Sequence, residues 1–210
     1  MFDNIDFKEF WNDCEYSEEN YHSADFTEEL LHDIETELGY KLPKAYIELM
    51  KTHNGGMVNF DCCPCDSPTS WAEDHICISG IMGIGREKEY SLCGELGSQF
   101  MIDEWEYPAI GVAICDCPSA GHDMVFLDYR ECGKDGEPCV VHVDQELDYK
   151  ITKLANTFEE FINKLCVIDD DNDSTTEMGE EDDTDINTNS GFRISEEWGK
   201  QMAANLHKKN

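Results

Sequence analysis

The chain has 210 residues, and its hydrophobic fraction of 40% is enough for the core of one domain with appended segments. With 47 acidic and 15 basic residues, its formal net charge is −32. Such a charge repels phosphate backbones, so we expect no nucleic-acid partner and favour a basic protein partner. The alternative is that the acidity serves only solubility.

The first residues, MFDNIDFKEFWNDCEY, carry acidic side chains where a secretory signal has a basic and then an apolar stretch. The longest apolar run, ICISGIMGIG at 76–85, is shorter than the roughly 20 residues that span a bilayer. We therefore expect no membrane partner and a cytoplasmic location. Eleven cysteines, an odd number, favour reduced thiols over a disulfide framework in such a chain.

Residues 25–38 predict an amphipathic helix, with Asp25 or Thr27 as its cap and Gly39 as its end. Apolar residues recur there at intervals close to four: Phe26, Leu30, Leu31, Ile34 and Leu38. Pro43 suits the first turn of a second helix, which ends at Asn54-Gly55-Gly56. The stripe expected to be buried on this second helix is Tyr46, Leu49, Met50 and His53.

After these glycines the pattern changes to short runs rich in β-branched residues, which predict strands at 76–81, 109–115, 123–129 and 139–143. The turn signal Gly133-Lys134-Asp135-Gly136 predicts that the last two strands form an antiparallel hairpin. A helix over 157–168, with Thr157 and Glu160 as a capping pair, closes the domain.

The carboxyl-terminal part of the chain has a different composition. Residues 167–190 contain ten acidic residues and no lysine or arginine, which predicts a disordered acidic linker. Residues 191–210 predict a short amphipathic helix with Ser195 as cap. The expected organisation is an N-terminal segment at 1–24, one domain at 25–166, the linker and the last helix.

Five stretches together resemble the SUKH superfamily: LGYKLPKAYIELMKTHNGG at 38–56, YPAIGVAICD at 107–116, GHDMVFLDY at 121–129, VVHVDQE at 140–146 and LANTFEEFI at 154–162. That superfamily includes bacterial immunity proteins and a yeast cell-wall-assembly regulator. The resemblance implies an α+β fold with a central, mostly antiparallel sheet packed with helices, no catalytic machinery, and a surface that binds a protein. The first expectation is therefore an immunity protein that neutralises a polymorphic toxin, and a basic nuclease is one candidate for that toxin. A regulatory scaffold of the cell-wall-regulator kind is the alternative, and a zinc-binding module is the second alternative.

The cysteine-rich stretch at 61–77 offers zinc ligands, although we first expect the protein to bind no cofactor. The candidate ligands are Cys62, Cys65, His75 and Cys77. The gap between Cys62 and Cys65 is common in zinc sites, whereas the single residue between His75 and Cys77 is tighter than usual. The alternative is a group of loop or core thiols.

We expect that this protein is not an enzyme, because the sequence lacks a nucleophile elbow, a P-loop and a dinucleotide fingerprint. His122 and Asp123 are neighbours at a strand edge, where adjacent side chains point to opposite faces. His142 remains a possible partner for a cysteine. Aromatic residues among carboxylates are typical of an interface with a basic partner, and the candidates are Trp71, Asp103, Glu104, Trp105, Glu106 and Tyr107. Core packing of the tryptophans is the alternative.

Overall fold

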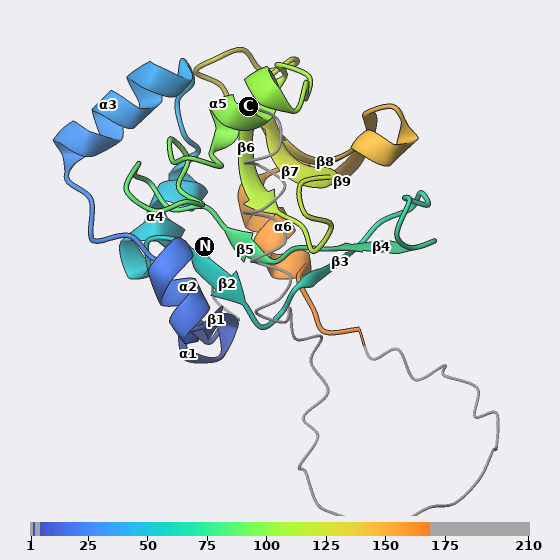
Figure 1. Ribbon diagram of the computed structural model, residues 1–210, viewed down its shortest axis with the longest axis horizontal. Helices are drawn as coiled ribbons and strands as arrows, with labels where there is room; N and C mark the ends of the chain where they lie inside the picture. Colours follow the sequence, from blue (N-terminus) through green and yellow to red (C-terminus); the bar gives the residue numbers. More distant parts are fainter. Residues whose placement is uncertain (1, 3–4, 169–210) are drawn as a thin grey trace, which may run out of the picture. The chain divides into compact units, whose positions relative to one another are not determined.

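The computed structural model describes residue 2 and residues 5–168 (Figure 1). The chain divides into two units, Met1–Val167 and Ile168–Asn210, and the description below concerns the first. The acidic linker and the last helix expected from the sequence lie, from residue 169 onward, outside the described residues.

The first unit is built on an antiparallel sheet of seven strands in the order β1-β2-β5-β6-β7-β8-β9. Their bounds are β1 Trp11–Asn12, β2 Gly56–Val58, β5 Gly80–Ile81, β6 Gly111–Asp116, β7 Asp123–Asp128, β8 Cys139–Asp144 and β9 Lys150–Ala155. A separate ribbon pairs β3 (Cys62–Pro64) with β4 (His75–Cys77). This architecture confirms the expected α+β fold with an antiparallel sheet.

The centre of the sheet is buried on both faces. Every residue of β6 and β7 is buried, which is why both strands read as nearly continuous apolar runs instead of alternating ones. Helix α6 (Phe158–Lys164) packs against β8, β9 and helix α4 (Lys44–Thr52), and helix α5 (Ser98–Glu104) packs against β6. Tyr46 of α4 and Phe158 of α6 meet edge to face in the core.

The predicted helix ends are set by local capping. Thr27, one of the two expected caps, accepts a hydrogen bond from the Leu30 N–H and begins α3 (Glu28–Leu38). Gly39 ends it at φ 76°, a left-handed conformation that a side chain would strain. Pro43 is the residue before α4, one position earlier than expected, and His53 lies beyond the end of that helix.

The closing helix α6 is shorter than predicted. Thr157 caps it by accepting a hydrogen bond from the Glu160 N–H, as expected. The Glu160 carboxylate bonds the Asn156 N–H instead of reaching back to Thr157. The helix ends at Lys164, not at residue 168.

One other expectation needs correction. The strand expected at 76–81 is divided, because β4 pairs with β3 in the ribbon while β5 joins β2 and β6 in the main sheet. Within the expected N-terminal segment, Trp11 pairs with Val58 at the sheet edge, and Tyr21 is buried. The elements not predicted include α1 (Phe7–Phe10), α2 (Glu15–Asn20), α5, β9 and the 3₁₀ helix η1 (Gln145–Leu147).

All eleven cysteines fall within the described residues, and none of them forms a disulfide. No helix in the described part of the chain is both long and apolar enough to cross a membrane.

Candidate partner-binding surface

One end of the central sheet gathers three loops. β6 and β8 end there, β7 and β9 begin there, and the connections are residues 117–122 and 145–149. The end of α5 and the following residues 105–107 form the third loop. We call this surface the acidic end of the sheet, and its exposed or half-exposed residues include Asp103, Glu104, Trp105, Glu106, His122, Glu146, Leu147 and Asp148.

Trp105 is half-buried at the centre of this surface. Its indole packs on Gly121, where an added Cβ would lie 3.4–3.5 Å from the indole carbons, and φ is 90°. The His122 ring meets the indole edge to face at a centroid distance of 5.7 Å. Glycine at 121 therefore permits both the turn and the close seat of the tryptophan.

Tyr107 is not part of the exposed surface, in contrast to the sequence expectation. It is 2% exposed, its ring stacks on Phe126, and its hydroxyl donates a 2.8 Å hydrogen bond to the Gly121 carbonyl. Glu106 has φ 59°, and the backbone turn at this residue leaves Glu106 exposed while Tyr107 enters the core. Tyr107 thus supports the surface from inside.

Strained backbone is concentrated in the same three loops. Among the described residues, the non-glycine residues with positive φ are Glu106, Ala120, Asp148 and Tyr149, at 56–64°. Each such conformation costs on the order of 1–3 kcal/mol and persists only where surrounding contacts fix it. The Tyr149 hydroxyl donates to the Trp105 carbonyl at 2.7 Å, and the Gln145 N–H donates to the His122 carbonyl at 2.9 Å. Clustered strain of this kind is typical of functional surfaces.

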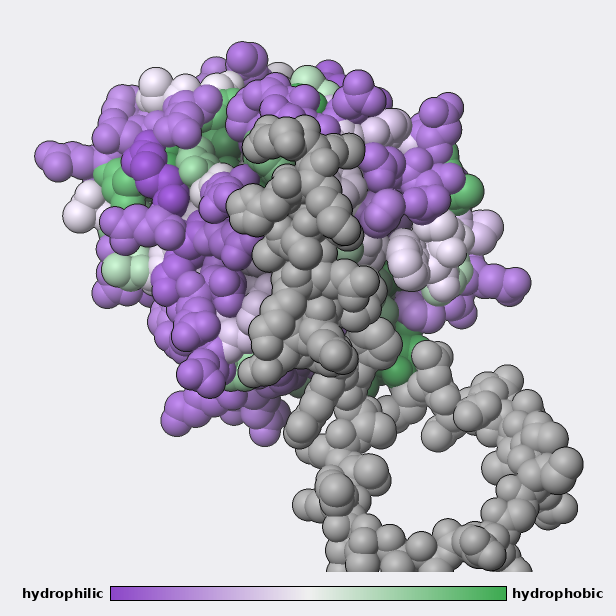
Figure 2. Space-filling model, viewed as in Figure 1, coloured by the Kyte–Doolittle hydropathy of each residue, from purple (hydrophilic) through white to green (hydrophobic). Residues whose placement is uncertain are grey.

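The exposed charges of these loops are predominantly negative. Asp103, Glu104, Glu106, Glu146 and Asp148 are all exposed. Within the described residues, no lysine or arginine forms an ion pair with any of them, whereas the Glu146 carboxylate lies 2.7 Å from His122 Nδ1. Hydrophilic side chains also dominate the face seen in Figure 2, so an abundance of polar residues alone does not distinguish a site. The acidic end is distinguished because its exposed carboxylates lie on strained loops that are hydrogen-bonded to one another.

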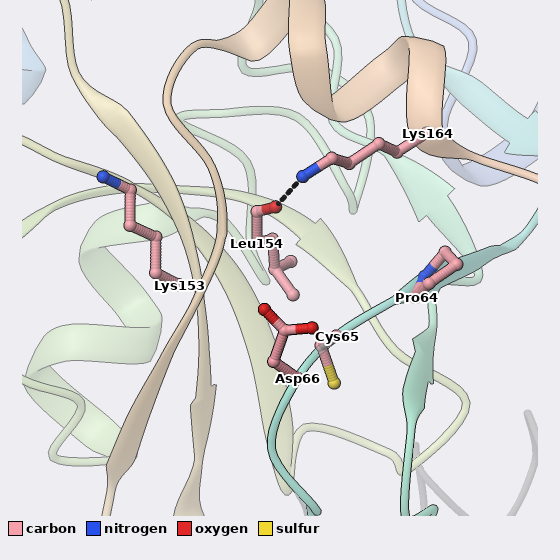
Figure 3. Close-up of a pocket in the computed structure, with 6 residues that line it drawn as sticks. All are labelled: Pro64, Cys65, Asp66, Lys153, Leu154 and Lys164. Carbon is pink, nitrogen blue, oxygen red and sulfur yellow. Dashed lines mark hydrogen bonds between the residues drawn. The ribbon is translucent and has the colours of Figure 1, made fainter.

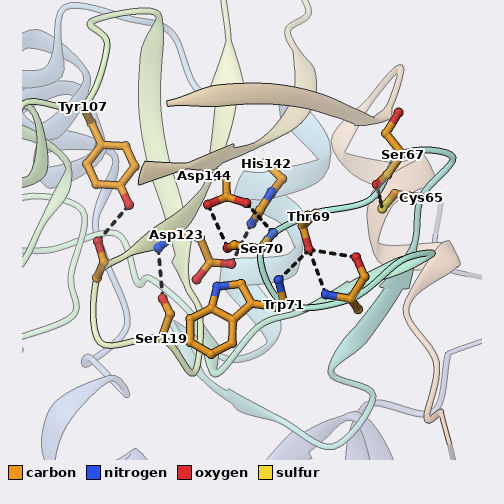
Figure 4. A network of polar contacts seen from close by, with 12 residues as sticks. Cys65, Ser67, Thr69, Ser70, Trp71, Tyr107, Ser119, Asp123, His142 and Asp144 are labelled. Atoms are coloured by element: carbon orange, nitrogen blue, oxygen red, sulfur yellow. Dashed lines mark hydrogen bonds and ion pairs between the residues drawn. The ribbon is translucent and has the colours of Figure 1, made fainter. Parts of the chain in front are cut away.

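Trp71 lies on the loop between β3 and β4, which is anchored at the same end of the sheet. The backbone N–H and the hydroxyl of Ser70 donate to the two carboxylate oxygens of Asp144, at 2.8 and 2.9 Å (Figure 4). Lys150 Nζ donates to the Pro68 carbonyl at 2.7 Å. Trp71 itself is 58% exposed, so it is available to a partner.

Buried aspartates lie beneath the loops. Asp123 Oδ2 is 2.6 Å from His142 Nε2, and Cys117 lies close to both, with all three side chains buried. Asp123 therefore pairs with His142 of the neighbouring strand and not with His122, its neighbour in the sequence. At the end of β6, burial raises the pKa of Asp116 to about 7, although the hydrogen bond from the Tyr21 hydroxyl opposes this shift. The Cys117, Asp123 and His142 side chains are thus enclosed beneath the loops.

The structure brings together three of the four predicted metal ligands. The ligand atoms of Cys62, His75 and Cys77 lie within 4.8 Å of one another. Cys65 is not in this group, because it follows Cys62 by three residues along the ribbon and so points to the other face, where its thiol lies 3.2 Å from the Ser67 carbonyl. The spacing of His75 and Cys77, tight for a loop, is the spacing that places two side chains on one face of a strand.

A pocket of about 270 Å³ lies beside the ribbon, lined by Pro64, Cys65, Asp66, Lys153, Leu154 and Lys164 (Figure 3). Lys164 Nζ donates to the Leu154 carbonyl at 2.8 Å, so one of its two lysines is already engaged. The pocket is smaller than the roughly 300–1,000 Å³ usual for ligand sites. The acidic end is therefore the better candidate site.

The fold is that of an α+β domain on an antiparallel sheet, and its candidate site is a loop surface instead of a cleft. The chain belongs to the SUKH_6 family, described as SMI1-KNR4 cell-wall, which matches residues 28–162. A comparison with curated proteins found no match.

Proposed function

We propose that this protein is an immunity protein that binds and neutralises a basic toxin domain through the acidic end of the sheet. Membership of the SUKH_6 family supports the general role, since the SUKH superfamily includes bacterial immunity proteins. A non-enzymatic mechanism fits the enclosure of the Cys117, Asp123 and His142 side chains. Inhibition then comes from occupying the toxin, not from modifying it.

The observation that carries this proposal is the arrangement around Trp105. Three strained loops hold a half-buried indole in the middle of five exposed carboxylates that have no lysine or arginine partner among the described residues. An aromatic anchor supplies contact energy, and surrounding charges steer a partner of opposite sign. Trp71 extends the same surface with a second exposed aromatic ring.

The test reverses the charge of this surface. Changing Asp103, Glu104 and Glu106 together to lysine should abolish protection of cells that produce the cognate toxin, and should slow association of the two purified proteins. The matched control changes Glu131, Asp135 and Glu137 to lysine, because these exposed acids lie in the β7–β8 loop at the opposite end of the same sheet. The control alters net charge equally and should still protect.

A second variant, in which residues 169–210 are deleted, distinguishes the immunity proposal from the regulatory-scaffold alternative. Under the immunity proposal this deletion leaves protection unchanged, since the family match ends at residue 162. Under the scaffold alternative the deletion abolishes function and the charge reversal is tolerated. A folded triple lysine variant that protects as well as the parent chain would refute the proposed surface.

A further inference from the structure

Three cysteines lie side by side across three neighbouring extended segments. Cys62 in β3 is opposite Cys77 in β4, and on its other side it pairs with Cys166 through an isolated antiparallel bridge. Cys62 and Cys166 exchange backbone hydrogen bonds of 3.0 and 2.9 Å. Directly opposite residues of an antiparallel pair place their side chains on the same face, so Cys77, Cys62 and Cys166 form one row.

His75 extends this row, because it precedes Cys77 by two residues on β4 and therefore shares its face. Cys62 and Cys77 are directly opposite each other but exchange no backbone hydrogen bonds, because the bonds of the ribbon lie on either side of them. In an antiparallel ladder, the side chains of such a non-hydrogen-bonded pair are closer together than those of a hydrogen-bonded pair. His75 and Cys77 are half-buried, so an ion can reach them from solvent.

The row does not serve the main hydrophobic core. Cys63 and Cys65, on the other face of the ribbon, pack with the main core cluster, whereas Cys62, Cys77 and Cys166 are not among its members. Cys77, Cys166 and His75 thus lie beside the buried Cys62 and outside the main core cluster.

These donors suit zinc. Zinc–sulfur and zinc–nitrogen bonds of about 2.3 and 2.0–2.1 Å place tetrahedral ligand atoms roughly 3.6–3.8 Å apart, and the Cys62, His75 and Cys77 ligand atoms already lie within 4.8 Å. Cys166 Sγ lies 3.5 Å from the Cys62 carbonyl oxygen on the same face. Cys166 is outside the group of ligand atoms within 4.8 Å, so zinc binding requires its side chain to turn toward the other three donors.

We propose that Cys62, Cys77, His75 and Cys166 bind one zinc ion in a structural site. The ion joins the β3–β4 ribbon to the segment that follows α6, two parts of the chain separated by 104 residues. The ribbon carries Trp71 in its connecting loop, so the zinc also fixes the base of that loop. The site is independent of the toxin-binding proposal and stands or falls on its own measurement.

The test measures metal in the full-length protein, produced with zinc in the medium and purified without chelators under reducing conditions. We expect about one zinc per chain by mass spectrometry. Cobalt exchanged into the site should show thiolate charge-transfer absorption and the visible bands of a tetrahedral ion. A chain that binds no zinc after reconstitution, or that carries a Cys62–Cys77 disulfide instead, overturns the proposal.

Substitutions identify the ligands. Cys62→Ser and Cys77→Ser should each reduce zinc to background, and Cys166→Ser should weaken binding and change the cobalt spectrum. Cys65→Ser is the matched control, because it removes a thiol from the other face of the same strand ribbon and should retain full zinc. Retention of full zinc by Cys62→Ser or Cys77→Ser would contradict the site.

A measurement on the unaltered chain tests the site even if the substituted chains fail to fold. Zinc should protect Cys62, Cys77 and Cys166 from alkylation, as mapped by peptide mass spectrometry, and a chelator should expose them. The exposed Cys14 and Cys132 should react equally in both conditions. Equal reactivity of Cys62 and Cys77 with and without zinc would refute the assignment.

Discussion

The hydroxyl of Tyr149 donates a 2.7 Å hydrogen bond to the carbonyl oxygen of Trp105, so the loop after β8 is tied directly to the end of α5. Tyr149 itself has a positive φ of 56°. This one bond therefore links a strained residue to the indole at the centre of the acidic end. Its removal should show whether the loops must be held in advance for binding.

Tyr149→Phe removes this bond, together with the 3.2 Å hydrogen bond that the hydroxyl accepts from Gln145 Nε2, and leaves the ring. We expect a loss of about 0.5–1.5 kcal/mol in the free energy of unfolding, together with weaker toxin binding. Tyr129→Phe is the control, since the Tyr129 hydroxyl also donates to a backbone carbonyl, that of Lys41, at 2.7 Å. The control should lose similar stability in denaturant titrations but bind normally. Equal binding by both variants would show that preorganisation of the loops is unimportant.

Glu106→Gly tests the strain at φ 59°. Relief of the left-handed conformation should raise the free energy of unfolding by about 1–2 kcal/mol. The greater conformational freedom of glycine in the unfolded chain should lower it by about 0.5–1 kcal/mol. The variant should therefore be more stable by about 0.5–1 kcal/mol, yet bind the toxin less tightly because a carboxylate is lost. Glu104→Gly, at the end of α5, also removes one carboxylate but should slightly reduce stability. A destabilised Glu106→Gly variant would contradict this account of the turn.

Asp116 should make stability depend on pH. Burial raises its pKa from 3.8 to about 7, so the folded state keeps a proton that the unfolded chain releases. The contribution is fully present below about pH 4 and is lost as pH rises toward 7. Asp116→Asn cannot ionise, so relative to the parent chain it should gain on the order of 2–4 kcal/mol between pH 4 and pH 7.

Urea titrations at several pH values would measure this difference. Tyr21→Phe provides a second reading, because the Tyr21 hydroxyl donates a 2.8 Å bond to Asp116 and opposes the rise in pKa. Without that bond the loss of stability should extend above pH 7. A difference between Asp116→Asn and the parent chain that does not change with pH would show that Asp116 ionises normally.

Salt should act on the rate of association with the toxin. If five carboxylates steer a basic partner, raising the ionic strength should lower the association rate by a factor of about 10–1,000 and change the dissociation rate far less. Stopped-flow measurements would give both rates. The lysine variant of Asp103, Glu104 and Glu106 should lose most of the salt dependence, and the Glu131, Asp135 and Glu137 control should keep it. A salt effect confined to dissociation would argue against steering.

Local signals in the sequence determined several parts of this protein. The caps at Thr27 and Thr157 and the end of α3 at Gly39 depend on hydrogen bonds and φ values within one helical turn, so they could be predicted. The β7–β8 hairpin was predicted because a glycine-rich turn joins two apolar runs. The same runs carry the family resemblance.

The tertiary structure decided what depends on partners distant in the chain. Residues 76–81 read as one strand, but pairing with β3 on one side and with β2 and β6 on the other divides them. The positive φ at Glu106 separates an exposed acid from the buried Tyr107, and nothing in the residue order specifies that turn. The choice of Cys77 and Cys166 as neighbours of Cys62, with Cys65 on the opposite face, follows from strand register, because the face of a side chain is fixed only when its strand is paired.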